Sequence, residues 1–426
     1  MPQASRIYKI LGKFNQPLER ITVNGLSTGS PKETLEVLQD THFPGGVESH
    51  FWDLRPQEES YVQSNVTIES TIDAINQFQP FRSAGPDGFP PFVLQLGGRW
   101  IAEALCAIYR ASLTIGYIPL EWRESKVVFI PKPGKSDYES PSSWRPISFM
   151  CFTLKALERI VDKMIRTTDL IHSLRQNHQF AYIEGGSTEA ALHRLVGYLE
   201  RNMSAKRRSL VAFIDVEGAF SNVSREGIME GMRHLQINPT ISRWVDHFLQ
   251  HRILKSTIKG YSASKCVSNG CPQGSCCSPI YWNIALNGLL QKLRERFPSL
   301  LIQAYADDIC IAATGICPFT LRDQIRRALL TIRSWCLERG LALNVDKTEL
   351  LWVDTSRKVI QPPISIDGRI VKVKAAVRYI GIWIDRRLNS NTHVRNKSDA
   401  CIKKLVMCQR AIGKFWGIHP RLAMWL

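Results

Sequence analysis

The most informative pattern along the chain is a set of apolar runs that end in carboxylates. Residues 209–215 (SLVAFID) form a continuous apolar run closed by Asp215, which is typical of a buried strand. Farther along, two apolar runs flank Asp307 and Asp308 at hairpin spacing, in the sequence LIQAYADDICIA. Asp-Asp is a poor pair for a two-residue hairpin turn, and local violations of this kind tend to fall at functional sites.

Other periodic segments predict helices and strands that interleave along the chain. Ser187 is the expected cap of one helix, and Thr320, with Asp323 three residues on, is the expected cap of a later one. Interleaved elements favour a mixed α and β fold with a sheet at its centre. We expect helices over 69–78, 101–115, 152–165, 187–202 and 319–339, a strand over 126–131, and a strand pair or hairpin over 377–385.

If the two carboxylate-ended segments are neighbours, Asp215, Asp307 and Asp308 converge at one sheet edge. Unpaired, they would repel and raise one another's pKa values. Two Mg²⁺ ions about 3.5–4 Å apart would remove that conflict and create a site for phosphoryl transfer. Mg²⁺ suits carboxylates together with substrate phosphates. The alternative is three structural aspartates, because Asp is a common turn residue.

The charge balance points to a polyanionic partner. Lys and Arg number 55 against 38 acidic residues, which gives a net charge of +17 that is spread along the 426 residues. A dispersed positive field suits a protein that holds nucleic acid. The alternative is a basic protein without such a partner. The length suggests two or three domains.

Cysteine usage and apolar content bear on the compartment. The 11 cysteines follow no regular spacing and include no CxxC motif, so neither a disulfide framework nor a zinc site is expected. We therefore expect a reducing intracellular location, in the nucleus or the cytoplasm. The chain begins without an apolar signal core, and no run approaches the roughly 20 residues that span a bilayer. A soluble protein without a membrane partner is expected.

Seven sequence blocks, in order over residues 83–385, resemble the reverse transcriptase of non-LTR (LINE-type, Jockey-like) retrotransposons. The blocks are SAGPDGFP, IPKPGK with WRPIS, AFIDVEGAF, GCPQGSCCSP, AYADDICIA, GLALNVDKT and RYIGIWID. A single YADD or GPDG would be weak evidence, whereas the ordered set is very specific. The resemblance implies an α+β right-hand polymerase, with fingers, a palm that contains an antiparallel sheet, and a partial thumb.

The same resemblance implies an RNA-directed DNA polymerase that extends a DNA 3′-hydroxyl primer on an RNA template, using deoxynucleoside triphosphates. Asp215, Asp307 and Asp308 would be its catalytic and metal-binding triad, with the Val216 carbonyl as a further oxygen ligand. The implied cofactor is a pair of Mg²⁺ ions, with Mn²⁺ as the alternative ion. These metals would lower the pKa of the primer hydroxyl and neutralise charge on the triphosphate.

Five further residues are implied to lie around the incoming nucleotide. Lys132 and Arg145 belong to the basic segment that covers the triphosphate, where a guanidinium can bind phosphate in two-pronged fashion, and Lys135 is a weaker candidate. Gln273 and Gly274 would border the nucleotide sugar and the template, since glycine lets the backbone approach a ligand closely. The plain alternatives are a solvated loop for the basic residues and a simple turn for Gln273 and Gly274.

Phe220 and Lys347 complete the implied site. The ring of Phe220 would lie beneath the sugar and block a 2′-hydroxyl, or else it is a core residue. Lys347, which shares the LNVDKT block with Asn344, would protonate the departing pyrophosphate if it lies near the leaving group, or else it is a surface charge. Ser221 stands where the family usually has an acid, which favours a catalytically inactive, nucleic-acid-binding remnant as the alternative function.

The resemblance also divides the chain. Relatives of this type usually carry an endonuclease and a longer C-terminal region, so a fragment is expected. A partner-binding protein that reuses the fold is a third alternative. We expect a partly ordered leader over 1–65, an N-terminal extension with the GPDG loop over 66–112, the reverse transcriptase domain over 113–385, and a truncated thumb-like helical tail over 386–426.

Overall fold

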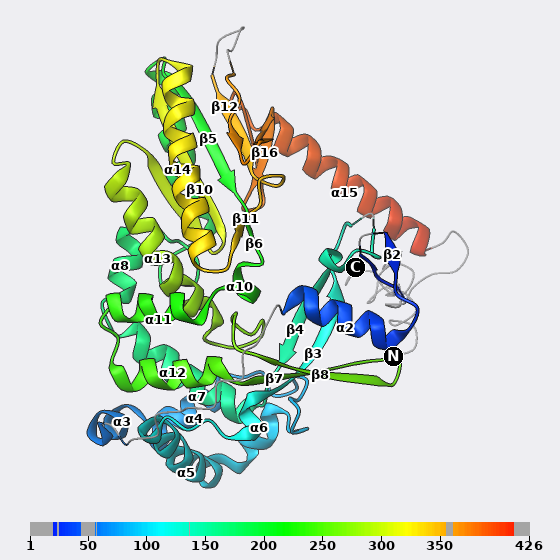
Figure 1. The fold of residues 1–426 in the computed structure, drawn as a ribbon, viewed down its shortest axis with the longest axis vertical. Helices are drawn as coiled ribbons and strands as arrows, with labels where there is room; N and C mark the ends of the chain where they lie inside the picture. The colour runs from blue at the N-terminus through cyan, green and yellow to red at the C-terminus, as the bar shows by residue number, and fades with distance from the viewer. Residues whose placement is uncertain are drawn as a thin grey trace.

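A five-stranded sheet, a four-stranded sheet, four two-stranded ladders and the helices around them make up the regular structure of the described residues (Figure 1). Parts of the expected leader (1–19 and most of 44–57) and of the expected tail (413–426) lie outside the described residues. This computed structural model describes residues 20–23, 25–43, 56, 58–135, 137–354 and 361–412.

Helices and strands interleave along the chain, as the apolar patterns predict. The helices are α2 (Pro31–His42), α3 (Glu59–Asn65), α4 (Ile68–Asn76), α5 (Pro91–Ile115), α6 (Leu120–Arg123), α7 (Phe152–Arg166), α8 (Leu170–Gln176), α9 (Thr188–Ser204), α10 (Ala219–Asn222), α11 (Arg225–His234), α12 (Pro239–Gln250), α13 (Ser278–Arg296), α14 (Pro318–Glu338) and α15 (Asn391–Ile412), with a short 3-10 turn η1 (Pro141–Ser143). Small two-stranded ladders join β1 (Thr22–Val23) to β2 (Leu26–Ser27), β6 (Val216–Glu217) to β11 (Ala342–Leu343), β13 (Ser365–Ile366) to β14 (Arg369–Ile370), and β16 (Ala376–Tyr379) to β17 (Ile382–Asp385).

The larger sheet has five strands, and the apolar run that precedes Asp215 is its middle strand. In spatial order the strands are β15 (Lys372–Lys374), β12 (Glu349–Val353), β5 (Arg208–Ile214), β10 (Asp308–Gly315) and β9 (Leu301–Tyr305). β5 pairs antiparallel with β10 on one side and β12 on the other. The β12–β15 pair is parallel, and the other pairs of this sheet are antiparallel.

β5 separates two apolar clusters, because successive side chains of a strand point to opposite faces of the sheet. Leu210, Ala212 and Ile214 belong to the larger cluster, together with buried residues of α13 and α14. Val211 and Phe213 belong to a second cluster, which α9 and the β16–β17 hairpin complete. Burial on both faces explains why the sequence of this strand is apolar without alternation.

The smaller sheet has four strands and is covered by α2. In spatial order its strands are β4 (Trp144–Phe149), β3 (Glu124–Pro131), β7 (Arg252–Ile258) and β8 (Tyr261–Val267). Leu35 and Leu38 of α2 lie in one buried cluster with Val127, Phe129 and Leu254 of this sheet. The N-terminal segment from residue 20 to residue 43 is therefore packed onto the sheet, and the sequence patterns did not predict α2.

Most predicted elements are present with shifted ends. Ser187 caps α9 as predicted, since its hydroxyl accepts a hydrogen bond from the amide of Ala190. The pattern over 377–385 forms the expected hairpin of β16 and β17. The predicted cap at Thr320 is wrong, because α14 begins two residues earlier at Pro318, whose missing N–H suits the first position of a helix.

The helix expected over 101–115 is the second part of a longer element. α5 begins at Pro91 and changes direction at Gly98, whose φ of 51° and ψ of −132° are not helical. A φ in this region is accessible to glycine at little cost. The chain therefore extends one helical element from the GPDG loop into the region that precedes β3.

α15 runs away from the β16–β17 hairpin and extends beyond the larger sheet (Figure 1). Within the expected tail, residues 391–412 are thus helical and residues 386–390 are not. Val394, Ile402 and Leu405 of this helix are exposed. Within the described ranges, no helix is both long enough and apolar enough to cross a membrane.

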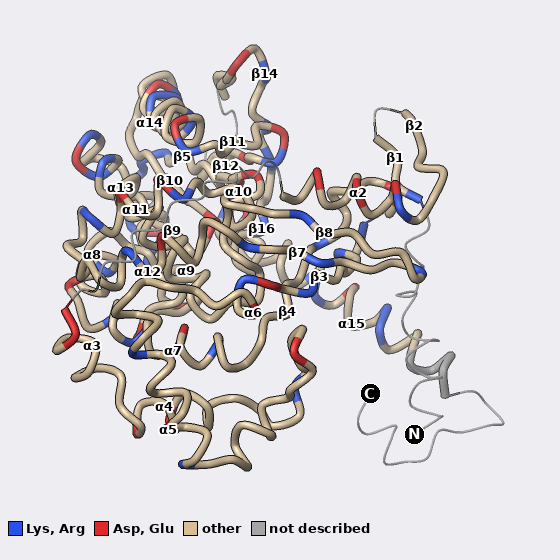
Figure 2. Tube along the Cα trace, turned by 60° about the horizontal axis from the view of Figure 1, so that its bottom comes forward, with Lys and Arg blue, Asp and Glu red and all other residues tan. Residues whose placement is uncertain are grey.

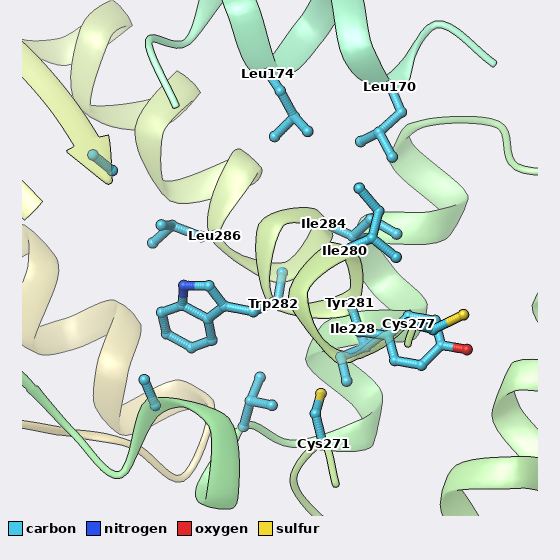
Figure 3. Close-up of a cluster of buried hydrophobic side chains, with 14 of the residues drawn as sticks. Leu170, Leu174, Ile228, Cys271, Cys277, Ile280, Tyr281, Trp282, Ile284 and Leu286 are labelled. Atoms are coloured by element: carbon cyan, nitrogen blue, oxygen red, sulfur yellow. The ribbon is translucent and has the colours of Figure 1, made fainter. Parts of the chain in front are cut away.

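α13 lies at the centre of the larger cluster and contacts α8, α11 and α14. Figure 3 shows its side chains beside those of α8 and α11, with the indole of Trp282 among them. The lack of a side chain at Gly231 of α11 lets α11 approach α13 closely. A Cβ at this position would lie only 2.6 Å from the carbonyl oxygen of Ile284 in α13.

We predict that Gly231→Ala lowers the free energy of unfolding by about 1–3 kcal/mol, since the added methyl forces two packed helices apart. Gly288 offers a matched control on α13, because it is helical, exposed, and a Cβ there meets nothing within 4 Å. Gly288→Ala should leave stability level or raise it by up to about 1 kcal/mol. Chemical denaturation of both variants measures this, and equal effects would contradict the packing argument.

Candidate active site

The register of the larger sheet brings the predicted carboxylates to one end. Ile214, the last residue of β5, pairs with Ile309 of β10, so Asp215 and Asp308 follow and precede directly paired residues. Asp307 lies in the turn that joins β9 to β10. The expectation that the two apolar segments are neighbours is confirmed.

The turn itself differs from the prediction by one residue. Asp308 is paired with Tyr305 as the first residue of β10, so the two-residue turn consists of Ala306 and Asp307 rather than of both aspartates. Ala306 has a φ of 56°, in the left-handed region that two-residue hairpin turns require. Such a φ costs an L-residue on the order of 1–2 kcal/mol. The local strain therefore falls on alanine and leaves Asp308 with ordinary strand geometry.

Two buried side chains hold Ala306 in this conformation. The side-chain amide of Gln179 accepts a hydrogen bond from the Ala306 amide (3.0 Å) and donates one to the Ala306 carbonyl (3.2 Å). The Trp282 indole donates a second hydrogen bond to the same carbonyl (3.1 Å). Gln179 and Trp282 are at most 1% exposed. Sequence reasoning missed both residues, although each is hydrogen-bonded to the backbone of the turn.

Asp307 and Asp308 sit in an environment that disfavours their charged forms. Burial raises the pKa of Asp307 above its usual value, and the charge of Asp215 adds to the effect. Loss of water around Asp308, followed by the charges of Asp307 and Asp215, raises its pKa to about 6. Mutual repulsion was the prediction from sequence, and desolvation turns out to be the larger cause.

A cleft of about 670 Å³ opens beside these carboxylates. Asp308 and Asn344 do not line it. The other predicted site residues do: Lys132, Lys135, Arg145, Asp215, Val216, Phe220, Ser221, Gln273, Gly274, Asp307 and Lys347. The structure thus brings together residues from positions 132 to 347 of the chain.

The LNVDKT block reaches the cleft through a short ladder with the segment after β5. Leu343 pairs with Val216, and the amide of Asn344 donates to the carbonyl of Asp215 (3.0 Å). The side chain of Asn344 then accepts from the amide of Lys347 (3.1 Å). This turn carries the ammonium of Lys347 to 3.4 Å from a carboxylate oxygen of Asp215.

Basic side chains form the opposite wall. The ammonium of Lys132 donates to the carbonyl of Ser142 (2.8 Å), and burial lowers its pKa, with the charges of Lys347 and Arg145 as further causes. His42 of α2 also lines this wall, a residue that sequence reasoning missed. Burial lowers the pKa of His42 to about 4, so it is neutral near pH 7. The wall is positively charged and faces the carboxylates, which suits a phosphate chain between them.

The loop with Gln273 and Gly274 touches β4 through its backbone. The carbonyl of Gln273 accepts a hydrogen bond from the amide of Ser148 (2.7 Å). Gly274 has a φ of 134°, and a Cβ there would lie 2.2 Å from the Ser148 carbonyl oxygen. Glycine is therefore required at this position by contact with β4, in addition to the close ligand approach that the sequence predicts.

Glu158 of α7 is hydrogen-bonded to the same loop, and sequence reasoning missed this residue. This α7 side chain is fully buried, and its carboxylate accepts hydrogen bonds from the hydroxyl of Ser275 and the amide of Cys276 (3.2 Å). Burial raises the pKa of Glu158 to about 7 despite these hydrogen bonds. A buried carboxyl with two loop donors fixes the segment that follows Gly274.

Phe220 connects the cleft to the core. Its ring lines the cleft and lies 5.9 Å from the ring of Trp282, measured between centroids. It is partly buried and packs against the larger apolar cluster. Its neighbour Ser221 receives a long contact from the side-chain amide of Gln273 (3.4 Å).

The donor set fits divalent cations that keep part of their water. Among the described residues, no three His, Cys, Asp or Glu side chains are grouped so as to hold a metal by themselves. Mg²⁺ is usually bound through one or two carboxylates together with waters and substrate phosphates, which an open set of carboxylates permits. The described cysteines around residues 266–277 likewise belong to no such group.

Residues 130–384 match the family described as reverse transcriptase (RNA-dependent DNA polymerase). The chain belongs to this reverse transcriptase family. The matched range contains all of the predicted site residues from Lys132 to Lys347, the whole five-stranded sheet, and the four-stranded sheet except for the first part of β3.

Among curated proteins the chain is similar to polymerases of mobile elements. It is 24% identical to a protein named probable RNA-directed DNA polymerase from transposon BS of Drosophila melanogaster, over 86% of this chain and 41% of that protein. It is also 24% identical to the RNA-directed DNA polymerase from mobile element jockey of the same species, over 97% and 46%. A Pol polyprotein of the retrotransposable element R1 from Bradysia coprophila is 24% identical over 98% and 41%.

These similarities confirm the resemblance to non-LTR reverse transcriptases that the seven blocks predict. The chain spans less than half the length of the relatives named above. The fold of this family member is α+β, as expected from sequence.

We predict that Glu158 makes the stability of the protein fall as the pH rises. Its pKa is about 7 in the folded protein against an ordinary value of 4.5, so the folded state is penalised once the carboxyl ionises. Relative to Glu158→Gln, wild type should lose about 1–3 kcal/mol of unfolding free energy between pH 4.5 and pH 7. Denaturant titrations at several pH values measure the difference.

Glu103→Gln provides the control for that series, because Glu103 is an exposed helical glutamate of α5. Its unfolding curves should follow those of wild type at every pH. If the Glu158→Gln and wild-type curves stay parallel across the range, the buried carboxyl is not the origin of the pH dependence.

Proposed function

We propose that this chain is an RNA-directed DNA polymerase that extends a DNA 3′-hydroxyl on an RNA template. The observation that carries the proposal is the convergence of Asp215, Asp307 and Asp308 at one sheet end, opposite a basic wall across a cleft of about 670 Å³. Opposed acidic and basic walls suit a nucleoside triphosphate whose reacting phosphate must meet a hydroxyl. The family and the printed names of the relatives support the same activity.

Asp215, Asp307, Asp308 and the Val216 carbonyl are the oxygen donors we assign to divalent cations, Mg²⁺ or Mn²⁺. When bound, two such ions would neutralise the carboxylates and polarise the phosphate and the hydroxyl. The raised pKa values of Asp307 and Asp308 support this assignment, because a carboxylate cluster is costly without a cationic partner. The hydrogen bonds from Gln179 and Trp282 to the backbone of Ala306 hold Asp307 and Asp308 in position before substrate binds.

The basic wall and the glycine loop orient the nucleotide. Lys132 and Arg145 bind the triphosphate, the former as a point charge and the latter as a planar fork. Gln273 and Gly274 border the sugar and the template. We assign to Lys347 the donation of a proton to pyrophosphate, and its 3.4 Å contact with Asp215 supports a position near the reacting phosphate.

We further propose that the two sheets correspond to the palm and fingers of a right-hand polymerase. The five-stranded sheet with the carboxylates is the palm, the four-stranded sheet with its basic residues belongs to the fingers, and α15 is part of a thumb. The domain division follows: a leader over 1–65, an extension over 66–112, the polymerase over 113–385 and a thumb-like tail over 386–426. RNA template, DNA primer and deoxynucleoside triphosphates are the partners of this arrangement.

A second candidate is a nucleic-acid-binding remnant without catalysis. Ser221, which stands where the family usually has an acid, favours it. Primer extension on an RNA template with Mg²⁺ separates the two candidates. Extension supports the polymerase, whereas salt-sensitive RNA binding without extension supports the remnant.

We predict that Asp307→Asn abolishes primer extension and leaves the fold intact. Since burial and Asp215 disfavour the charged form of Asp307, neutralising it should leave the melting temperature without divalent ions level or higher. The exposed Asp323 of α14 provides the control, because Asp323→Asn removes the same charge outside the cleft and should retain extension. A large fall in the melting temperature of Asp307→Asn would indicate a structural network instead.

We predict that Phe220→Ala raises ribonucleotide incorporation relative to deoxyribonucleotide by roughly tenfold or more. The ring would deny a 2′-hydroxyl both space and a hydrogen-bond partner, and an unsatisfied polar group costs about 1–3 kcal/mol. A purely structural Phe220 would instead lose about 3–5 kcal/mol of stability with the sugar ratio unchanged. Single-nucleotide extension with both sugars, run beside a thermal melt, distinguishes the two outcomes.

A further inference from the structure

A second hollow, of about 570 Å³, lies against β9 and shares no lining residue with the cleft. It is lined by Leu300, which precedes β9, and by Ile302 near the start of that strand, whereas the carboxylate turn follows the end of β9. α8, α9 and α13 supply most of its remaining wall. Its polar lining includes His178, Arg194, Arg294, Gln176, Asn177 and Gln291.

Two arginines of this hollow are anchored through one nitrogen each. Nη1 of Arg194 donates to the carbonyl of Ile302 (3.2 Å) and to the side-chain oxygen of Gln303 (3.1 Å). Nη1 of Arg294 donates to the carbonyl of Gln176 and to the side-chain oxygen of Asn177 (2.8 Å). Each guanidinium is thereby fixed in place, while its Nε and Nη2 donors have no partner among the described residues.

These two positive charges are not neutralised by ion pairs. Within the described ranges, no carboxylate lies at ion-pairing distance from Arg194 or Arg294. Glu295 also lines the hollow, but its carboxylate accepts a hydrogen bond from Gln291 of the preceding turn (2.9 Å). Two pre-oriented guanidiniums without carboxylate partners are a strong arrangement for an oxyanion, because the side-chain entropy is already lost.

The pKa of His178 is affected by the positive charges of Arg194 and Arg294. Its backbone adopts a φ of 57° and pairs with β9, since its carbonyl accepts from the amide of Ala304 (3.0 Å). Burial lowers the pKa of His178 to about 4, and the charges of Arg194 and Arg294 lower it further. Near pH 7 the imidazole is neutral and can donate or accept one hydrogen bond beside the two arginines.

We propose that this hollow binds a backbone phosphate of single-stranded RNA, at a site separate from the polymerisation cleft. The proposal rests on the proposed function for the identity of the strand. Two anchored guanidiniums match the geometry of a phosphate group. Gln176 and Gln291 are exposed at the rim, and their amide nitrogens already contact His172 and Glu295. Their side-chain oxygens suit the ribose 2′-hydroxyl that distinguishes RNA from DNA, because they can accept a hydrogen bond from it.

The position of the hollow gives this contact a use. The hollow lies near the start of β9, and the carboxylate turn follows the end of β9. An RNA strand held in the hollow is therefore separated from the carboxylates by the length of this β-strand. The charge pattern permits such a path, since Lys and Arg lie on many elements rather than in one segment (Figure 2). RNA gripped there would remain tethered to the enzyme while the cleft moves along the template.

The test compares two arginines of the same helix in the full chain. Arg294→Gln removes one anchored guanidinium, whereas Arg296→Gln removes an equal charge from an exposed arginine that does not line the hollow. A fluorescent single-stranded RNA oligonucleotide is titrated at several salt concentrations. We expect Arg294→Gln to weaken binding roughly five- to tenfold and to reduce the salt slope by about 1, with less than a twofold change for Arg296→Gln.

A second variant guards against misfolding. Gln291→Glu places a negative charge at the rim without touching either anchor, so it should also weaken RNA binding while its thermal melt stays like that of wild type. Single-stranded DNA of the same sequence should lose less affinity than RNA in Arg294→Gln. The proposal would be overturned if Arg294→Gln and Arg296→Gln lose RNA affinity equally. It would also be overturned if Arg294→Gln and Gln291→Glu both bind RNA as tightly as wild type.

Two further arms identify the ligand and separate this proposal from the polymerase assignment. If millimolar inorganic phosphate stabilises wild type but not Arg294→Gln, and RNA affinity is equal in both, the hollow is a small-anion site and the RNA proposal fails. Primer extension is measured on the same preparations. If the wild-type protein extends primers, and the Arg294→Gln variant binds RNA as tightly as wild type, only the RNA-binding proposal for the hollow is refuted. If the wild-type protein does not extend primers, and the Arg294→Gln variant binds RNA more weakly than wild type, only the polymerase assignment is refuted.

Discussion

The hydrogen bonds to the backbone of Ala306 are the interaction on which the site depends. A two-residue hairpin places an alanine in the left-handed region, and that conformation is maintained by partners on both its amide and its carbonyl. Strained backbone persists where the surroundings over-determine it. Gln179 and Trp282 provide that determination from buried positions. Asp307 and Asp308 therefore inherit their placement from a glutamine and a tryptophan that are remote in sequence.

Trp282 also couples the two halves of the cleft. Its indole nitrogen binds the carboxylate turn, while its ring lies against Phe220 at the cleft surface. On the other side, Glu158 fixes the loop that contains Gly274, and that loop touches β4 through Ser148. Buried polar groups of this kind are satisfied by defined partners, which makes the surrounding arrangement unique rather than merely stable. The cleft is thus shaped by buried side chains that do not themselves line it.

The features predicted from sequence are those that local patterns determine. Ser187 caps α9 because capping needs only the residues beside it, and the run before Asp215 is a strand because its apolar character is continuous. The roles of Gln179 and Glu158 were not predictable, since an isolated glutamine or glutamate has no periodic signal and its partners lie more than 100 positions away. The cap at Thr320 was mistaken because a proline two residues earlier opens the helix.

The two-faced burial of β5 has a consequence for how the family can vary in length. Even-numbered residues such as Ala212 face one apolar cluster and odd-numbered ones such as Val211 face the other. Inserting or deleting one residue would exchange the two sets and carry Asp215 away from its partners. Natural copies should therefore accumulate point changes in this strand but no gaps. The tip of the β7–β8 hairpin at Gly260, where added atoms meet open space, is the kind of place where length can change freely.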